Sequence, residues 1–328
     1  MTAFAVSFLD ITCRLDAPEQ VAREWAAMTE PFFTVAGGPP PRADLLVEVE
    51  IGPRPRPAPD GVPVLLHGDL KGRVRRDAGD RWVVSSELAT YTVVAGRPPR
   101  VLAAYEQGAP VALDALRVVR GLLTALAESR GLGKVHAACV DAGGVGIALV
   151  GDVGAGKTSF ALTGLRAGSN FVANDKLLVD RHGRAHGLPL AVAIAVESLA
   201  DLGCELPAEA RVIDGKWYEW PARVATLCGT ACSTSTTIDV VVVCELDLSA
   251  RRVAALPVTA NERARLLTGP VALFSDRIHP SWLAELLDLR PAPAQPSIPP
   301  AASWVRLRGN PWREDWLDRV LLPAAAAS

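Results

Sequence analysis

The sequence has no long uninterrupted apolar run, although 49% of its 328 residues are apolar. A membrane-spanning helix needs about 20 consecutive apolar residues, so we expect no membrane segment. The first ten residues also lack the basic start and the apolar stretch of a secretory signal. We therefore expect a folded cytoplasmic protein, with enough apolar side chains for one large core or two smaller ones.

An excess of charge is missing as well. The 34 basic and 36 acidic residues leave a formal net charge of −2. A nearly neutral chain has no general electrostatic attraction to nucleic acid or to an anionic membrane, so we expect neither as a partner. Lysine is scarce, and Lys157 is one of only five in the chain.

Cysteine is infrequent and scattered, which is typical of proteins from a reducing compartment. Of the six cysteines, only Cys228 and Cys232 are close in sequence. A zinc site would need two further ligands, and no nearby histidine or cysteine supplies them. We interpret this pair as structural.

The most specific pattern in the chain is residues 151–158, which read Gly-Asp-Val-Gly-Ala-Gly-Lys-Thr. They match the phosphate-binding pattern G-x-x-x-x-G-K-[ST] at every fixed position. The glycines allow a tight turn that brings backbone N–H groups to a polyphosphate, while Lys157 can reach its β and γ oxygens and Thr158 can hold Mg²⁺. The residues predicted to contact the nucleotide are Gly151, Asp152, Val153, Gly154, Ala155, Gly156, Lys157, Thr158 and Ser159.

The residues around this loop favour the same interpretation over a chance glycine-rich turn. Residues 145–150 form a short apolar run that is typical of a buried strand, and residues 159–167 predict the helix that follows. Such a helix directs the partial positive charge of its N-terminus at the phosphates. The sequence therefore predicts a nucleoside triphosphate site.

Periodicity and composition predict an α/β protein with three parts. Residues 1–110 are expected to form a small β-rich module, residues 111–290 the domain that carries the loop, and residues 291–328 a proline-rich linker with a C-terminal docking segment. Strands are expected at 45–51, 81–86, 91–94, 100–105, 135–140, 145–150, 171–173, 177–179, 238–244 and 304–308, a helix at 113–129, and an amphipathic segment at 311–320.

Three polar side chains stand near the loop, on or after predicted strands. His136 precedes Gly151 by fifteen residues, and Asn174 and Asp175 directly follow the strand expected at 171–173. Taken alone, His136 fits a packed strand histidine. The ordinary interpretation of Asp175 is a strand-end cap or a turn residue.

The block from residue 136 to residue 180 resembles the catalytic core of the HPr kinase/phosphorylase family. In that family a strand with a histidine and a turn precede G-D-x-G-x-G-K-[ST], and a helix and a strand ending in Asp-Asp follow. The resemblance implies a P-loop kinase-like fold that binds ATP and Mg²⁺. The catalytic residues that it implies are Lys157, Asp175, His136 and Asn174, with Thr158 and Asp175 holding the metal.

The sequence departs from the family at Asn174, where the kinases have the aspartate that accepts the proton of the nucleophile. A neutral amide cannot act as a general base, although it can orient a hydroxyl or bind a metal through its oxygen. The glutamate-bearing signature that usually follows is not found either. Because phosphoryl transfer relies mainly on positioning and electrostatics, Asp175 or the substrate itself can suffice.

We expect ATP- and Mg²⁺-dependent phosphoryl transfer to a hydroxyl of a small molecule, a peptide or a protein serine. Two alternatives stay open because of Asn174. The chain is then either an ATP-binding regulatory or assembly module with a degenerate kinase site, or an ATPase coupled to a partner enzyme. A homo-oligomer is also left open.

Two further groups have less specific patterns. His182 and His186 are four residues apart, a spacing that binds metal on helices, but neighbouring glycines favour a loop that is solvated or faces the substrate. Its position after the strand at 171–173 would place Arg184 or His186 near the acceptor. Six of the eight tryptophans follow residue 216, and those near the C-terminus are interspersed with arginines. They either grip a peptide or an anionic substrate, or dock the C-terminal segment onto the core or a neighbouring subunit, and we favour docking.

Overall fold

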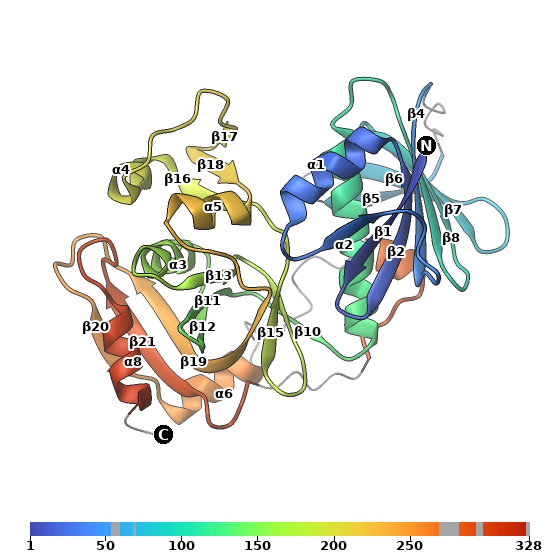
Figure 1. Ribbon diagram of the computed structural model, residues 1–328. Helices are drawn as coiled ribbons and strands as arrows, with labels where there is room; N and C mark the ends of the chain where they lie inside the picture. Colours follow the sequence, from blue (N-terminus) through green and yellow to red (C-terminus); the bar gives the residue numbers. More distant parts are fainter. Residues whose placement is uncertain (54–59, 68–69, 269–281, 293–297, 326–328) are drawn as a thin grey trace. The chain divides into compact units, whose positions relative to one another are not determined.

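The computed structural model describes residues 1–53, 60–67, 70–268, 282–292 and 298–325 (Figure 1). It is a mixed α/β protein, as the sequence predicts. The chain divides into two compact units, here called the first unit (Met1–Gly131 with Asp276–Pro293) and the second unit (Leu132–Ser275 with Ala294–Ser328). Within the described residues, no helix combines the length and the apolar character that crossing a membrane requires.

The first unit is built on one nine-stranded sheet with the order β3-β1-β2-β4-β9-β8-β7-β6-β5. Its strands are β1 (Thr2–Phe8), β2 (Ile11–Ala17), β3 (Thr34–Gly37), β4 (Leu45–Ile51), β5 (Val62–His67), β6 (Leu70–Arg76), β7 (Arg81–Ser86), β8 (Ala89–Val94) and β9 (Arg100–Tyr105). Its helices are α1 (Glu19–Thr29), α2 (Val111–Ser129) and α7 (Trp282–Leu286). The predicted strands at 45–51, 81–86 and 100–105 are confirmed with the same bounds.

Helix α2 groups with the first unit, whereas a boundary at residue 110 assigns it to the second. It contacts α1 and β2, and its first turn is tied to the sheet by a buried carboxylate. Asp114 Oδ2 accepts hydrogen bonds from the phenols of Tyr91 at 2.5 Å and Tyr105 at 2.8 Å. Because all three side chains are buried, these bonds are strong and fix the start of the helix on the sheet. The division between the units therefore follows α2.

The second unit contains a large mixed sheet and a small one. The large sheet has the order β10-β14-β15-β19-β12-β11-β13, with β21 paired to β19 and β20 paired to β21. Its strands are β10 (Gly133–Val135), β11 (Ala138–Ala142), β12 (Val145–Val150), β13 (Asn170–Ala173), β14 (Leu177–Val179), β15 (Arg184–Gly187), β19 (Ser235–Leu246), β20 (Ala254–Pro257) and β21 (Ser303–Gly309). The small sheet has the order β16-β18-β17, from β16 (Val192–Ala195), β17 (Val212–Ile213) and β18 (Lys216–Glu219).

Six helical segments complete the second unit. They are α3 (Lys157–Arg166), η1 (Val196–Ser198), α4 (Leu199–Leu202), α5 (Pro221–Leu227), α6 (Ala260–Thr268) and α8 (Leu317–Ala325), counted over the described residues. Helix α3 contacts β11, β12 and β13, and in Figure 1 it lies beside these strands. Phe160 and Leu165 of α3 are fully buried. This packing fixes the start of α3 at the end of β12.

The centre of the large sheet is β19, which pairs in parallel with β12 and, along its other edge, with β21. Val240, Val241 and Val242 are at most 1% exposed, because both faces and both edges of the strand are covered. The central strand predicted at 238–244 is therefore confirmed. The strand predicted at 304–308 is also confirmed, but as β21 it belongs to the central sheet. Residues 293–297 of the expected proline-rich linker lie outside the described residues.

The single strand expected at 135–140 is wrong. Strand β10 ends at Val135 and β11 begins at Ala138, so His136 lies between two strands. Strand β10 pairs with β14, whereas β11 pairs with β12 and β13. The strand that the chain pairs with therefore changes at His136. An apolar pattern in the sequence does not predict such a change.

The C-terminal segment packs against the helix that follows the loop. Trp316 is fully buried, and its ring meets that of Phe160 edge-on with the centroids 5.8 Å apart. Its indole N–H donates to Phe160 O at 3.1 Å and to Thr163 Oγ1 at 2.9 Å. A Cβ at Gly164 would lie 3.0 Å from Trp316 Cζ2, so a larger residue there would push the ring out of its present position. The docking interpretation holds for this tryptophan.

Replacing Trp316 with alanine should lower the free energy of unfolding by about 3–5 kcal/mol, since a large buried ring is lost and a cavity remains. Urea denaturation followed by circular dichroism measures this change. Trp312→Ala is the matched control, because Trp312 is only partly buried and should cost less. Equal losses for the two variants would contradict the packing described for Trp316.

Candidate functional site

The candidate site lies at the loop between β12 and α3, residues 151–156. The loop is held by hydrogen bonds from Ala155 N to Asp152 O (3.1 Å) and from Leu246 N, at the end of β19, to Ala155 O (3.0 Å). Gly156 precedes α3 with φ at +91°, and a Cβ there would lie 2.7 Å from Leu246 Cβ. Gly151 has φ at +148°, and its Cβ would lie 2.8 Å from Ala155 Cβ. Both positions therefore require glycine.

The start of α3 presents free N–H groups to this loop. The first N–H within α3 that reaches a backbone carbonyl is that of Phe160, which donates to Gly156 O at 2.9 Å. Among the described residues, the N–H groups of 156–159 have no hydrogen-bond acceptor. Unpaired N–H groups and the helix dipole together favour an anion at this point.

Lys157 supplies a cation beside these N–H groups. Its Nζ donates to Gly151 O at 2.7 Å and to Asp152 O at 3.1 Å, so the ammonium lies over the loop. Burial lowers the pKa of Lys157, while the nearby carboxylate of Asp175 acts in the opposite direction. A phosphate oxygen can replace the two carbonyls, because it is the stronger acceptor for an ammonium.

Thr158 is joined to the end of β13. Its Oγ1 donates to Asn174 Oδ1 at 3.1 Å. Asn174 is 6% exposed and directly follows Ala173, the last residue of β13. The amide therefore holds the hydroxyl that the phosphate-binding pattern assigns to the metal.

His136 and Asp175 form a second pair across the same site. His136 Nδ1 lies 2.9 Å from Asp175 O and 3.2 Å from Asp175 Oδ1. Both oxygens are acceptors, so Nδ1 must carry a proton, and in the neutral ring Nε2 then keeps a lone pair. Burial and the charge of Lys157 lower the pKa of His136, which outweighs the opposite effect of Asp175. The neutral ring is therefore the main form at pH 7.

Asp175 has an unusual backbone conformation. Its φ is +71°, in the left-handed region that few residues other than glycine adopt. Aspartate and asparagine tolerate this region better than other side chains. Strained backbone of this kind is concentrated at functional sites, and here it orients Asp175 so that both its carbonyl and its carboxylate meet His136.

These groups share one cavity of about 420 Å³ in the second unit. His136, Asn174 and Asp175 line it. Of the nine residues predicted to contact the nucleotide, Gly151, Asp152 and Ala155 do not line it and instead shape the loop. The other six, Val153, Gly154, Gly156, Lys157, Thr158 and Ser159, line it. The structure thus brings together every predicted catalytic residue.

One wall of the cavity was not predicted. It is formed by residues 190–198 and by the small sheet, with Lys216 and Tyr218 as its largest polar side chains. The sequence did contain a signal, because Lys216, Trp217 and Tyr218 alternate between polar and apolar in a strand. The tryptophan is buried, and its neighbours face away from the core.

The histidines at 182 and 186 are not part of this site. They lie in the hairpin of β14 and β15, where His186 Nε2 is 4.0 Å from Asp180 Oδ2. Arg184, in the same hairpin, donates to Ser235 Oγ at 2.7 Å. None of the three lines the described cavity, so the idea that Arg184 or His186 approaches the acceptor is not supported.

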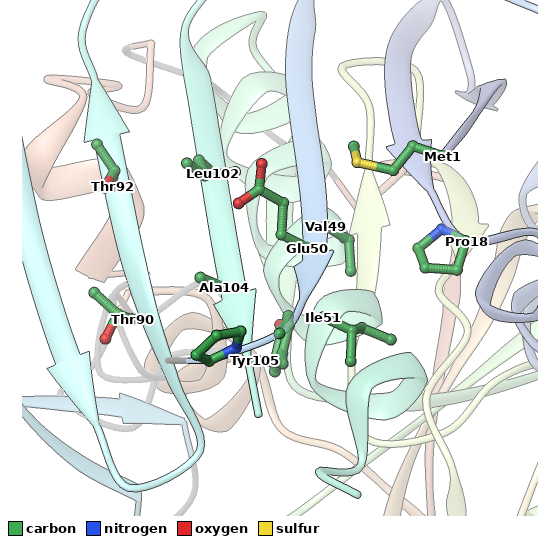
Figure 2. A pocket seen from close by; sticks show the side chains of 12 residues that line it. Met1, Pro18, Val49, Glu50, Ile51, Thr90, Thr92, Leu102, Ala104 and Tyr105 are labelled. Carbon is green, nitrogen blue, oxygen red and sulfur yellow. The ribbon is translucent and has the colours of Figure 1, made fainter. Parts of the chain in front are cut away.

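The first unit has a cavity of its own, of about 500 Å³, shown in Figure 2. It lies over β4, β8 and β9, where Glu50 stands among Ile51, Leu102 and Ala104. Among the described residues that line it there is no lysine, arginine or histidine. This cavity lacks the paired acids, bases and anion-binding N–H groups that line the cavity of the second unit. The cavity of the second unit is therefore the better candidate for a functional site.

Comparison with known proteins adds no family to this geometry. The chain matches no protein-family model and no curated protein sequence.

Proposed function

We propose that this protein is a P-loop kinase resembling the HPr kinase/phosphorylase family, which transfers the γ-phosphoryl group of ATP to a hydroxyl in the presence of Mg²⁺. The observation that carries the proposal is the shared cavity. One cavity of about 420 Å³ is lined or bordered by a glycine loop with free N–H groups, by Lys157 and by the His136–Asp175 pair. The acceptor is a small molecule, a peptide or a protein serine.

The loop fits a triphosphate in shape and charge. The N–H groups of 156–159 have no acceptor among the described residues, and Lys157 lies beside them. Buried or half-buried donors of this kind are costly to leave without a partner, so an anion completes them. Lys157 would move from the two loop carbonyls to the β and γ oxygens, where the charge of the transition state develops.

The donor set also fits Mg²⁺ bound together with a nucleotide. Among the described residues, no cluster of three or more His, Cys, Asp and Glu side chains could hold a metal by itself. Mg²⁺ usually takes one or two protein oxygens and completes its shell with phosphate and water. The Thr158 hydroxyl and the Asp175 carboxylate would hold it, and when bound it neutralises charge on the phosphate oxygens.

His136 is the best candidate to accept the proton of the acceptor. Asn174 cannot, because it is an amide whose oxygen is already bonded to Thr158. Neutral His136 has its Nδ1 proton directed at Asp175 and a lone pair on Nε2. In the step proposed, the acceptor oxygen bonds to the γ-phosphorus, the bond to the β–γ bridging oxygen breaks, ADP leaves, and the hydroxyl proton passes to Nε2.

This role predicts a pH dependence. Because the pKa of His136 is lowered, the neutral base persists below the ordinary histidine pKa of 6.5. The ratio kcat/KM should stay level from pH 8 to about 6.5 and fall only below that value. A pH–rate profile measures this, and His136→Asn should remove the falling limb together with most of the rate. A limb centred above 6.5 would contradict the assignment.

The proposal is tested by incubating the protein with Mg-ATP and candidate hydroxyl acceptors and detecting the phosphorylated product by mass spectrometry. A product that gains one phosphoryl group, with equal release of ADP, supports the kinase. Nucleotide binding without transfer, even in Asn174→Asp, would favour a regulatory module. Release of inorganic phosphate without a phosphorylated product would favour an ATPase.

A further inference from the structure

One wall of the cavity is built from β16 and β18. These strands are antiparallel, with Ala193 directly opposite Tyr218 and Ala195 directly opposite Lys216. Residues directly opposite each other point to the same face of a sheet, and all four line the cavity. The intervening Ile194 and Trp217 point to the other face and are at most 2% exposed.

Small side chains on β16 and long ones on β18 leave room for a ligand at this wall. The alanines of β16 are small, whereas Lys216 and Tyr218 on β18 are long and exposed. Ser198, at the end of η1, lines the cavity as well. The buried Trp217 and Ile194 anchor the wall to the core, which makes it a rigid surface for recognition.

The polar side chains of this wall have no partners within the described part of the chain. Lys216 forms no ion pair there, and the hydroxyls of Tyr218 and Ser198 form no hydrogen bond. Lys216 and Tyr218 are exposed and Ser198 is half-buried, so the ammonium and the two hydroxyls on this wall are open to a ligand in the cavity.

The charges in the cavity indicate the sign of that ligand. Among the described lining residues, Asp175 is the single carboxylate, and it is paired with His136. Lys157 is bonded to the loop. Lys216 is the lysine of the lining that has neither a hydrogen bond nor an ion pair among the described residues, and its ammonium with two neutral hydroxyls matches a group of one negative charge.

We propose that Lys216, Tyr218 and Ser198 form a carboxylate-binding subsite, and that the phosphoryl acceptor is a small hydroxy acid. This inference rests on the proposed function. The carboxylate of the acceptor bonds to Lys216, and its hydroxyl is thereby directed to the γ-phosphate held by the loop. Lys216 positions the acceptor and takes no part in the transfer of the proton.

The test compares hydroxy acids with their uncharged amides. Wild-type protein is saturated with Mg²⁺ and the non-hydrolysable analogue adenylyl imidodiphosphate. It is then titrated with glycolate, L-lactate and D-glycerate, and separately with glycolamide, L-lactamide and D-glyceramide. At least one acid should bind about 10- to 100-fold more tightly than its amide, because a charge-assisted bond is lost in the amide. Lys216→Gln should abolish that difference, and Lys71→Gln, at an exposed position of β6 in the first unit, should retain it.

The outcomes are distinguishable from those of the proposed function. If the wild type binds the nucleotide but binds each acid no better than its amide, or binds neither, the carboxylate subsite is wrong and the kinase proposal stands. If Lys216→Gln weakens nucleotide binding tenfold or more, Lys216 belongs to the nucleotide site, which also overturns the inference. If the wild type binds no nucleotide, the proposed function itself fails.

Discussion

Lys157→Ala should lower the rate of ADP formation from Mg-ATP by about a thousandfold, measured with an acceptor that the wild type phosphorylates. Lys157 places its ammonium over the loop, 2.7 Å from Gly151 O, at the point where β and γ oxygens are expected. In the proposed reaction, alanine removes the charge that balances the leaving phosphate, and it leaves the N–H groups of the helix start in place. The loss should therefore fall mainly on kcat, with a smaller effect on nucleotide affinity.

The control for this variant is Lys71→Ala. Lys71 is exposed on β6 of the first unit and does not line the cavity, so its replacement should leave the rate unchanged. Thermal unfolding of both variants checks that each is folded. A Lys157→Ala protein that is folded and as active as the wild type would show that the loop is not the site of chemistry.

Asp175→Asn should lower kcat at least about a hundredfold while the protein stays folded. Asparagine has the same shape as aspartate and also tolerates the left-handed backbone at φ +71°. The substitution therefore removes the negative charge without straining the chain. In the proposed mechanism it takes away a ligand of Mg²⁺ and weakens the acceptor that orients His136.

Asp288→Asn is a matched control for this charge removal. Asp288 also has a positive φ, of +50°, is exposed, and does not line the cavity. It should retain full activity and stability. An unaltered kcat in Asp175→Asn would mean that neither metal binding nor the orientation of His136 depends on this carboxylate, and the proposed mechanism would then be wrong.

The loop could be predicted from the sequence because its motif is one contiguous segment. The residues of the pattern lie between Gly151 and Ser159 and are contiguous with the flanking strand and helix, whereas the contact of Leu246 with the loop could not be predicted from the sequence. The strand at 145–150 and the central strand around Val240 were predictable because apolar runs of that length are buried in sheets. The positions of Asn174 and Asp175 followed from the end of β13.

The other features of the fold and of the site could not be predicted, because they depend on pairing between segments that are distant in the sequence. The wall with Lys216 depends on β16 and β18, which are four residues each and are joined through η1, α4 and β17. Their apolar pattern is too short to be recognised alone. The break at His136 and the assignment of α2 to the first unit depend likewise on partners far along the chain. The hydrogen bond of His136 to Asp175, 39 residues away, could not be read from spacing.

The most direct test of the central claim is a calorimetric titration of the wild type with Mg²⁺ and adenylyl imidodiphosphate. The loop at 151–158 predicts one site per chain, with affinity reduced at least about tenfold in Lys157→Ala and unchanged in Lys71→Ala. The absence of saturable binding to the wild type, or equal affinities in the wild type and Lys157→Ala, would contradict a nucleotide site at this loop.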